Sequence, residues 1–221
     1  MDSAVFAGLP VGLQRHLVRR VIERLHPDEM DISYATLERA SNFITGSHDR
    51  SRIDLPNDLH LLREGSLTYI VFGDATLSIE RWPQMPDGST HLPLQIPGSV
   101  SLSGGWKLSC ERWNIASLAI EQAKSNEDPF QVWLDAGTIS EALELRVRHV
   151  SDRFEPLGMD GHEVKLSDFF INVKLPRRAR DRWPLLCIGE KVIWVPGYRP
   201  AHPFRLTEST RQALYFLMTR G

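Results

Sequence analysis

The chain has 221 residues, 42% of them hydrophobic and 24% charged, which allows one large or two small globular domains with a buried core. No apolar run approaches the roughly 20 residues that span a bilayer, and the opening MDSAVFAGLPVG has no basic leader, so we expect a cytoplasmic protein with no membrane contact. The two cysteines, Cys110 and Cys187, are far apart in apolar surroundings and are predicted to be buried free thiols.

Charge is unevenly divided along the chain. Residues 1–145 carry 12 Lys and Arg against 20 Asp and Glu, a net charge of −8, whereas residues 146–221 carry 14 against 8, a net charge of +6. This split indicates two parts, the second of which would attract a polyanion. A basic, solvated face that binds nothing is the alternative interpretation.

The first 46 residues are predicted to form a pair of helices. Apolar residues recur at helical spacing from Leu13 to Leu25, after Pro10 and before Pro27. A second helix is predicted over SYATLERASNFIT, with Asp31 or Ser33 as its N-cap and Gly46 beyond its end.

Residues 51–135 are predicted to be rich in β-structure. The runs RIDLP, LHLLREG, LTYIVFG and ATLSIERW are short and β-prone, whereas the four prolines of WPQMPDGSTHLPLQIPG predict a loop. Ser103-Gly104-Gly105 begins like the phosphate loop of ATP-using adenylating enzymes, but Lys107 and Leu108 stand where that loop needs Asp and Ser. The strand-like WKLSCERW also follows where a helix is required, so a turn between two strands is predicted.

Residues 143–221 are predicted to form a compact mixed domain. LELRVRHV should be a strand with Arg146 and Arg148 on one side, and PLLCIGEKVIWV a hairpin that turns at Gly189-Glu190. KLSDFFINV and PRRARDRW are predicted to be short helices, and TESTRQALYFLM a terminal helix capped by Thr207. The expected fold class is α+β: an N-terminal helical pair with a β-rich middle, followed by a compact mixed α/β C-terminal domain.

No residue spacing typical of catalysis or metal binding is present. The eight histidines show no His-x-x-x-His pattern, and neither Cys-x-x-Cys nor Gly-x-Ser-x-Gly occurs. Asp152 with Glu155, or Asp160 with Glu163, could be an acid–base pair, but their polar loop offers nothing to raise a pKa. We therefore predict no catalytic or metal-binding residue and favour a recognition module.

The last third of the chain resembles the C-terminal region of bacterial tRNA(Ile)-lysidine synthetases. The resemblance rests on DRFEPLGMDGHEVKLSDFFINVKLPRRARDRWPLL followed by KVIWVPGYR, whose motifs fall in the family's order at residues 152–154, 156–158, 165–170, 176–180, 183–186 and 194–197. Ser151 stands where the family prefers Gly. LPVGLQRHLVRRVIERL resembles the first helix of the family's preceding substrate-recognition domain, and residues 51–142 match only in length and strand pattern.

This resemblance implies two domains that grip tRNA. Residues 1–142 would be a first tRNA-recognition domain, with helices over 10–46 and β-structure over 51–135, and residues 143–221 would bind the acceptor stem. The family joins lysine to the wobble cytidine of an isoleucine tRNA, using ATP and magnesium in an N-terminal domain that is missing from this sequence. We therefore expect this chain to hold no cofactor and to be inactive alone, with the isoleucine tRNA and the missing catalytic domain as partners and a homodimer as a further possibility.

Nine basic residues are the candidates for RNA contact, because a guanidinium fork suits phosphate and A-form RNA is read through its backbone and minor groove. They are Arg146, Arg148, Arg153, Lys165, Lys174, Arg177, Arg178, Arg180 and Arg199. Two alternatives stay open. One is a protein-interaction or dimerisation module built on the apolar hairpin and the terminal helix, and the other is a stand-alone enzyme that uses the loop from Asp152 to Glu163.

Overall fold

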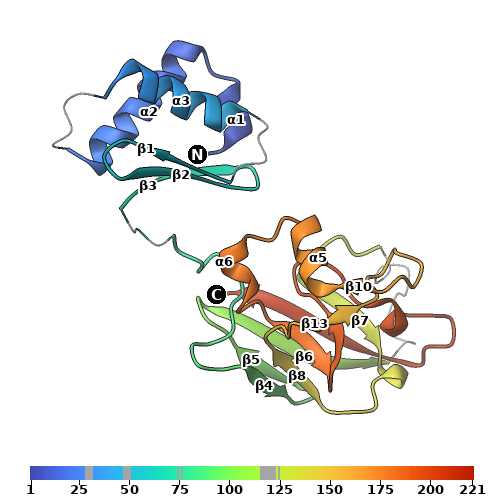
Figure 1. Cartoon of the computed structure of the whole chain (residues 1–221). Coiled ribbons are helices and arrows are strands. Elements are labelled where there is room, and N and C mark those ends of the chain that lie inside the picture. Colours follow the sequence, from blue (N-terminus) through green and yellow to red (C-terminus); the bar gives the residue numbers. More distant parts are fainter. Residues whose placement is uncertain (28–31, 47–50, 74, 76, 115–122, 124) are drawn as a thin grey trace. The chain divides into compact units, whose positions relative to one another are not determined.

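The computed structural model describes residues 1–27, 32–46, 51–73, 75, 77–114, 123 and 125–221, and the chain divides into two compact units, Met1–Leu77 and Ser78–Gly221 (Figure 1). The sequence-based boundary at residue 142 differs from this division. Strands from both sides of residue 142 pair in the same sheets, as β4 (His91–Leu94) does with β8 (Leu143–Arg146). The α+β class is confirmed.

The first unit packs three helices on one face of a three-stranded antiparallel sheet (Figure 1). The helices are α1 (Ser3–Ala7), α2 (Val11–Leu25) and α3 (Tyr34–Thr45), and the strands, in sheet order, are β1 (Arg52–Leu55), β2 (Leu59–Glu64) and β3 (Leu67–Phe72). Both predicted helices and three of the four predicted β-prone runs are therefore confirmed. Residues 28–31 and 47–50 lie outside the described residues.

Local signals explain where these helices begin. Pro10 stands at the N-cap of α2, and the Ser33 side chain caps α3 by accepting a hydrogen bond from the Thr36 N–H, 3.2 Å away. The buried face of α2 centres on Val18 and Ile22. These two side chains belong to the same hydrophobic core as buried residues of α3 and β2. Helix formation here depends on this amphipathic packing more than on propensity.

The second unit is built from two four-stranded antiparallel sheets that share one core. The first sheet has the order β12–β11–β8–β4, and the second has the order β5–β6–β13–β7. The strands not yet bounded are β5 (Gly98–Ser101), β6 (Trp106–Asn114), β7 (Gln131–Asp135), β11 (Leu185–Ile188), β12 (Lys191–Trp194) and β13 (Gln212–Arg220). A small pair, β9 (Arg153–Phe154) with β10 (Val164–Lys165), and the helices α5 (Leu166–Asn172) and α6 (Arg177–Arg180) complete the unit, with one 3₁₀ turn at Ala136–Thr138 and another at His202–Phe204.

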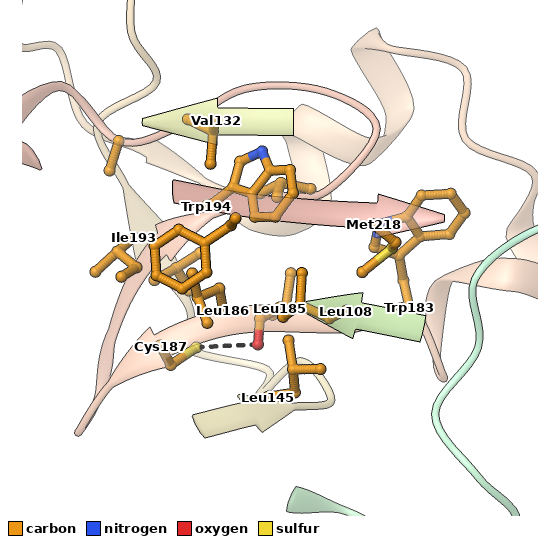
Figure 2. Close-up of a cluster of buried hydrophobic side chains, with 14 of the residues drawn as sticks. Leu108, Val132, Leu145, Trp183, Leu185, Leu186, Cys187, Ile193, Trp194 and Met218 are labelled. Atoms are coloured by element: carbon orange, nitrogen blue, oxygen red, sulfur yellow. Dashed lines mark hydrogen bonds between the residues drawn. The ribbon is translucent and has the colours of Figure 1, made fainter. Parts of the chain in front are cut away.

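Two tryptophans occupy the centre of this core. Figure 2 shows Trp194 and Trp183 among aliphatic side chains from both sheets, including Leu108 and Leu145. Trp194 is 1% exposed and Trp183 2% exposed, and the Trp183 indole donates to the Pro196 carbonyl at 3.0 Å. Burial of this size contributes several kcal/mol for each aromatic side chain. Both residues are therefore part of the core.

Several local predictions in this unit are confirmed. The hairpin forms from β11 and β12 with Gly189 at φ +50°, and the two short helices form as α5 and α6. Ser103-Gly104-Gly105 is the turn between the antiparallel strands β5 and β6. Within the described residues, no helix combines the length and the apolar character that crossing a membrane requires.

Three sequence-based assignments are wrong. The terminal segment is the strand β13 and not a helix, since it pairs with β6 along all nine of its residues and with β7 on its other edge. The proline-rich loop contains β4, which tolerates Pro93 because it is an edge strand. The described residues of ATLSIERW form no strand, and residues 74, 76, 115–122 and 124 lie outside the description.

Replacing Gly104 with alanine should destabilise the second unit by about 3 kcal/mol, because its φ is +68° and a Cβ would meet the Glu80 carbonyl oxygen at 2.9 Å. Gly88→Ala is the matched control, since its φ is +75° with nothing within 4 Å of the new Cβ, and it should cost about 1 kcal/mol. All six tryptophans lie in the second unit, so their fluorescence during urea unfolding measures this unit alone. Equal losses for the two variants would contradict the close approach to Glu80.

Candidate nucleic-acid interface

Three guanidinium groups gather where α6 meets the end of β8. Pro176 begins α6 and Ala179 turns into the core, which leaves the arginines of this short helix at the surface. Burial lowers the pKa of Arg180 below its ordinary value, and the positive charges of Arg148 and Arg177 lower it further. Arg148 and Arg177 are therefore each close enough to Arg180 to act on its charge, and we call these three side chains the arginine cluster.

The contacts of the arginine cluster neutralise only part of its charge. Arg148 pairs with Asp181 at 2.6 Å, but the Asp181 side chain is 76% exposed, so the pair stabilises the fold very little. Arg180 donates from Nε to the Leu175 carbonyl at 2.8 Å, which orients the side chain without neutralising it. Arg177 is exposed and forms no ion pair within the described residues. The cluster thus keeps an excess of positive charge.

Arg146, predicted to contact RNA, is instead buried in an ion pair with Asp152. The two side chains are each 4% exposed and form a bidentate pair, with both N–O distances 2.8 Å. Arg146 also donates to the carbonyls of Val147 and Glu190. Because water and ligands cannot reach it, Arg146 is removed from the candidate contacts. The alternation of side chains along LELRVRHV could not show that the face with Arg146 points into the protein interior.

Asp152 is the acceptor that organises the turn after β8. Burial alone would raise its pKa, but the hydrogen bonds from Arg146 and from the His149 N–H outweigh burial and lower the pKa below its ordinary value. The His149 N–H donates to Asp152 Oδ2 at 2.7 Å. Asp152 therefore ties both ends of the 146–152 turn, and this turn carries Arg148 to the arginine cluster.

Three further candidates lie around the small β9–β10 pair and α5. Arg153 and Lys165 are opposite each other in that pair, and both are exposed. Arg153 is held by Glu163 at 2.6 Å across the pair. Lys174, in the connection from α5 to α6, is exposed with a left-handed φ of +56°. Lys165 and Lys174 form no ion pair within the described residues, so their charges can act on a ligand.

The last two candidates make structural contacts. Arg178 donates to the Ser78 carbonyl at 2.7 Å, and its guanidinium lies 4.7 Å from the centre of the Trp82 ring. Arg199 is exposed and donates to the Leu157 carbonyl at 3.0 Å. Arg178 therefore fastens α6 to the segment before β4, whereas Arg199 has further donors for a ligand.

The loop from Asp152 to Glu163 lacks the features of an enzyme site. Of the loop's four carboxylates, Asp152 and Glu163 are in ion pairs with arginines, and the pKa of Asp152 is lowered where a general acid needs a raised one. Cys110 and Cys187 are buried free thiols, as predicted, and burial raises the pKa of each to about 12, which makes them poor nucleophiles. Among the described residues, no three His, Cys, Asp or Glu side chains gather as a metal site would require.

The net charge of the second unit is close to neutral. Residues 78–221 contain 18 Lys and Arg against 17 Asp and Glu, a net charge of +1. The excess of +6 in residues 146–221 is thus offset inside the same unit by residues 78–145, which have 4 against 9. Attraction of a polyanion must therefore come from the local arginine cluster rather than from the unit as a whole.

Comparison with known proteins defines the class of the second unit. Residues 143–214 match the protein-family model described as "TilS substrate C-terminal domain". The crystal structure of a TilS C-terminal domain aligns with 59% of this chain and 95% of its own, with a TM-score of 0.51 and 23% sequence identity. At that identity the likeness concerns the fold alone, and the second unit has this fold.

Longer relatives extend the match over the whole chain. The tRNA(Ile)-lysidine synthase of Symbiobacterium thermophilum is 27% identical over 225 residues, which cover 100% of this chain and 44% of that protein. The enzymes of Caldanaerobacter subterraneus and Geobacter sulfurreducens are 27% and 29% identical, and the matches cover 95% and 96% of this chain and 42% of each enzyme. The chain spans less than half the length of these relatives. The resemblance predicted from sequence is confirmed: the chain corresponds to the C-terminal region of tRNA(Ile)-lysidine synthases.

Sequence reasoning missed how these residues come together. Arg148 precedes Arg177 by 29 positions, and no local pattern shows that they share one surface. The acidic partners of Arg146, Arg148 and Arg153 lie 6, 33 and 10 positions away along the chain. An Arg and an Asp six residues apart on either side of a turn would have been the available signal.

Removing the cation of the buried pair should be costly to stability. Arg146→Met leaves the Asp152 carboxylate buried without its partner, and we expect a loss of about 3–5 kcal/mol in the unfolding free energy of the second unit. Adding Asp152→Asn removes the buried charge yet keeps an acceptor for the His149 N–H, so about 2 kcal/mol should return. Urea unfolding followed by tryptophan fluorescence checks both values. A double variant no more stable than Arg146→Met would contradict this account.

The same pair predicts a dependence of stability on pH. The pKa of Asp152 is lower in the folded protein than in the unfolded chain, so its contribution is complete above the ordinary carboxyl pKa of about 4 and declines as pH falls through the folded pKa. Unfolding free energies measured between about pH 5 and pH 2 should fall more steeply for the natural chain than for Arg146→Met/Asp152→Asn. Parallel curves would show that another group causes the acid sensitivity.

Proposed function

We propose that this chain is the tRNA-binding part of a tRNA(Ile)-lysidine synthase and that the arginine cluster holds the phosphate backbone of the isoleucine tRNA at its acceptor stem. The single observation that carries this proposal is the arginine cluster itself, which lies within residues 143–214, the segment matched by the family model. The relatives are named for their action on tRNA(Ile), and this chain aligns with their C-terminal part.

Electrostatics supports a polyanionic ligand at this surface. The positive charges of Arg148 and Arg177 act unfavourably on that of Arg180 in the unbound protein, and a phosphate bound beside them would reduce that repulsion. Each guanidinium can donate two hydrogen bonds to one phosphate, which adds geometric selectivity to charge. A run of phosphates along an A-form stem would extend these contacts to Lys165 and Lys174, which are also exposed.

We assign the modification of the tRNA to the part of the longer relatives that this chain does not cover. ATP and magnesium would act there, because the described residues do not fit ATP. The Ser103-Gly104-Gly105 turn joins two strands, and the Gly104 carbonyl accepts a hydrogen bond from Arg220. This chain alone should bind tRNA without modifying it. We place this function in the bacterial cytoplasm, a reducing compartment in keeping with two free thiols.

A dimer or protein-interaction module is the competing proposal. The hairpin and terminal segment that were expected to form its surface are buried, with every residue of β11 inside and β13 paired on both edges. A homodimer would therefore need another surface, such as the exposed apolar residues Val5 and Leu13 of the first unit. Sedimentation of the chain with and without tRNA separates these two proposals.

Binding of the isoleucine tRNA across a salt series tests the main proposal. For Arg177→Gln/Arg180→Gln we expect about tenfold weaker binding near 0.1 M salt, and the slope of log K against log salt should shrink by about 2, one unit for each lost phosphate contact. Lys107→Gln/Arg112→Gln is the charge-matched control, because both residues are exposed on β6 of the same unit. Its affinity and slope should stay within about twofold of the natural chain.

The outcomes discriminate clearly between the proposals. Equal losses for the two double variants would assign binding to diffuse charge and overturn the role of the arginine cluster. No binding of any tRNA at low salt, together with a concentration-dependent dimer, would favour the interaction module. Unchanged tryptophan fluorescence in urea must accompany the variants, because Arg180 also supports the Leu175 carbonyl.

A further inference from the structure

The motif at residues 194–197 folds into a tight turn that ends at Tyr198. Pro196 and Gly197 are the central residues of the turn, with Gly197 at φ +80°, and the Tyr198 N–H donates to the Val195 carbonyl at 3.0 Å. Proline followed by a glycine of positive φ is the composition of a type II turn. The local sequence therefore sets the direction in which the backbone presents Tyr198.

Hydrogen bonds fasten this turn to the rest of the second unit. The Trp183 indole donates to the Pro196 carbonyl at 3.0 Å, and the Gly197 N–H donates to the Pro129 carbonyl at 2.8 Å. A Cβ at position 197 would lie 3.0 Å from the Phe130 ring, so the turn is also closely packed. The backbone that carries Tyr198 is thus fixed before any ligand binds, which lowers the entropic cost of binding.

The Tyr198 ring packs against two aromatic side chains near α6. Its centre lies 6.0 Å from that of Phe169 in an edge-on contact and 5.6 Å from that of Trp183. Phe169 is 6% exposed and Trp183 2% exposed, so both rings are fixed parts of the core. Trp183 comes three positions after the end of α6. Tyr198 therefore lies close to the helix that carries Arg177 and Arg180.

The Tyr198 hydroxyl is accessible and has no hydrogen-bond partner among the described residues. It is also not one of the buried oxygen atoms that lack a partner, so it reaches solvent. The Tyr215 hydroxyl in the same unit instead donates to Gln131 at 2.9 Å. Because a phenol both donates and accepts, Tyr198 offers a ligand a neutral hydrogen-bonding group of each kind.

Arg180 is the charged side chain that acts on this hydroxyl among the described residues. Burial raises the pKa of the Tyr198 hydroxyl, and the positive charge of Arg180 lowers it by a smaller amount. The hydroxyl therefore stays protonated at neutral pH and can donate a hydrogen bond. A neutral donor thus stands beside one guanidinium of the arginine cluster.

We propose that the Tyr198 hydroxyl forms a hydrogen bond with an oxygen of the RNA backbone, next to the phosphate that Arg180 binds. That oxygen belongs to the phosphate or to the neighbouring ribose 2′-OH, which donates and accepts as the phenol does. Sugar and phosphate oxygens alternate along the strand, so a side chain close to Arg180 meets one of them when the guanidinium holds a phosphate. This inference rests on the proposed function, since it takes Arg180 to bind tRNA.

Tyr198→Phe tests the contact, because it removes the hydroxyl and keeps the ring that packs on Trp183 and Phe169. We expect about fivefold weaker binding of the isoleucine tRNA near 0.1 M salt, as for the loss of one neutral hydrogen bond. The slope of log K against log salt should not change, because a hydroxyl displaces no counterion. Urea unfolding should not change either, since the hydroxyl has no partner in the free chain.

Tyr215→Phe is the matched control. It also removes one hydroxyl from the second unit, but that hydroxyl is bonded to Gln131 within the protein, so tRNA affinity should stay within about twofold of the natural chain. An acceptor-stem RNA hairpin with 2′-fluoro riboses, which keep A-form geometry, identifies the partner oxygen. The fivefold loss in Tyr198→Phe disappears on this hairpin if the partner is a 2′-OH and persists if the partner is a phosphate oxygen.

Failure of this inference is distinguishable from failure of the proposed function. Normal tRNA binding by Tyr198→Phe, alongside weakened binding by Arg177→Gln/Arg180→Gln, overturns the Tyr198 contact alone. A salt slope reduced by about 1 in Tyr198→Phe also overturns it, because the hydroxyl would then act by positioning Arg180. A natural chain that binds no tRNA overturns both proposals. Weaker binding with an unchanged slope and unchanged stability supports the contact.

Discussion

Arg146 and Asp152 are buried together at the end of β8, and much of the candidate interface depends on their bidentate contact. The pair closes the 146–152 turn, accepts the His149 N–H and reaches the Glu190 carbonyl in the β11–β12 turn. It therefore joins the strand, the turn that carries Arg148 and the hairpin beside it. A buried ion pair of this kind seldom adds net stability over apolar packing, but it permits few alternative geometries. Its contribution is to fix where the exposed arginines stand.

Local structure could be predicted from the sequence where the signal itself is local. The β11–β12 hairpin follows from two apolar runs around Gly189, and α5 and α6 follow from their apolar spacing and Pro176. The terminal strand β13 could not be predicted in this way. Its partners in β6 lie about 100 positions away. The half-buried Tyr215 and Leu217 alternate with buried residues but are apolar too, so the sequence lacks the polar alternation that identifies a half-exposed strand.

The candidate site was predictable in composition but not in arrangement. The arginine-rich segment was evident, and Arg177 is exposed while Arg180 is half-buried. Whether a given arginine is available depends on a partner elsewhere in the chain, as with Asp152 for Arg146 or the Ser78 carbonyl for Arg178.

In the second unit, the local arrangement of charged side chains matters more than the net charge. The second unit is nearly neutral, yet Arg148, Arg177 and Arg180 are held close enough to lower the pKa of one of them. Residues 78–145, with 4 Lys and Arg against 9 Asp and Glu, offset most of the positive charge of residues 146–221. A phosphate backbone would thus be attracted to this local surface and not to the unit as a whole.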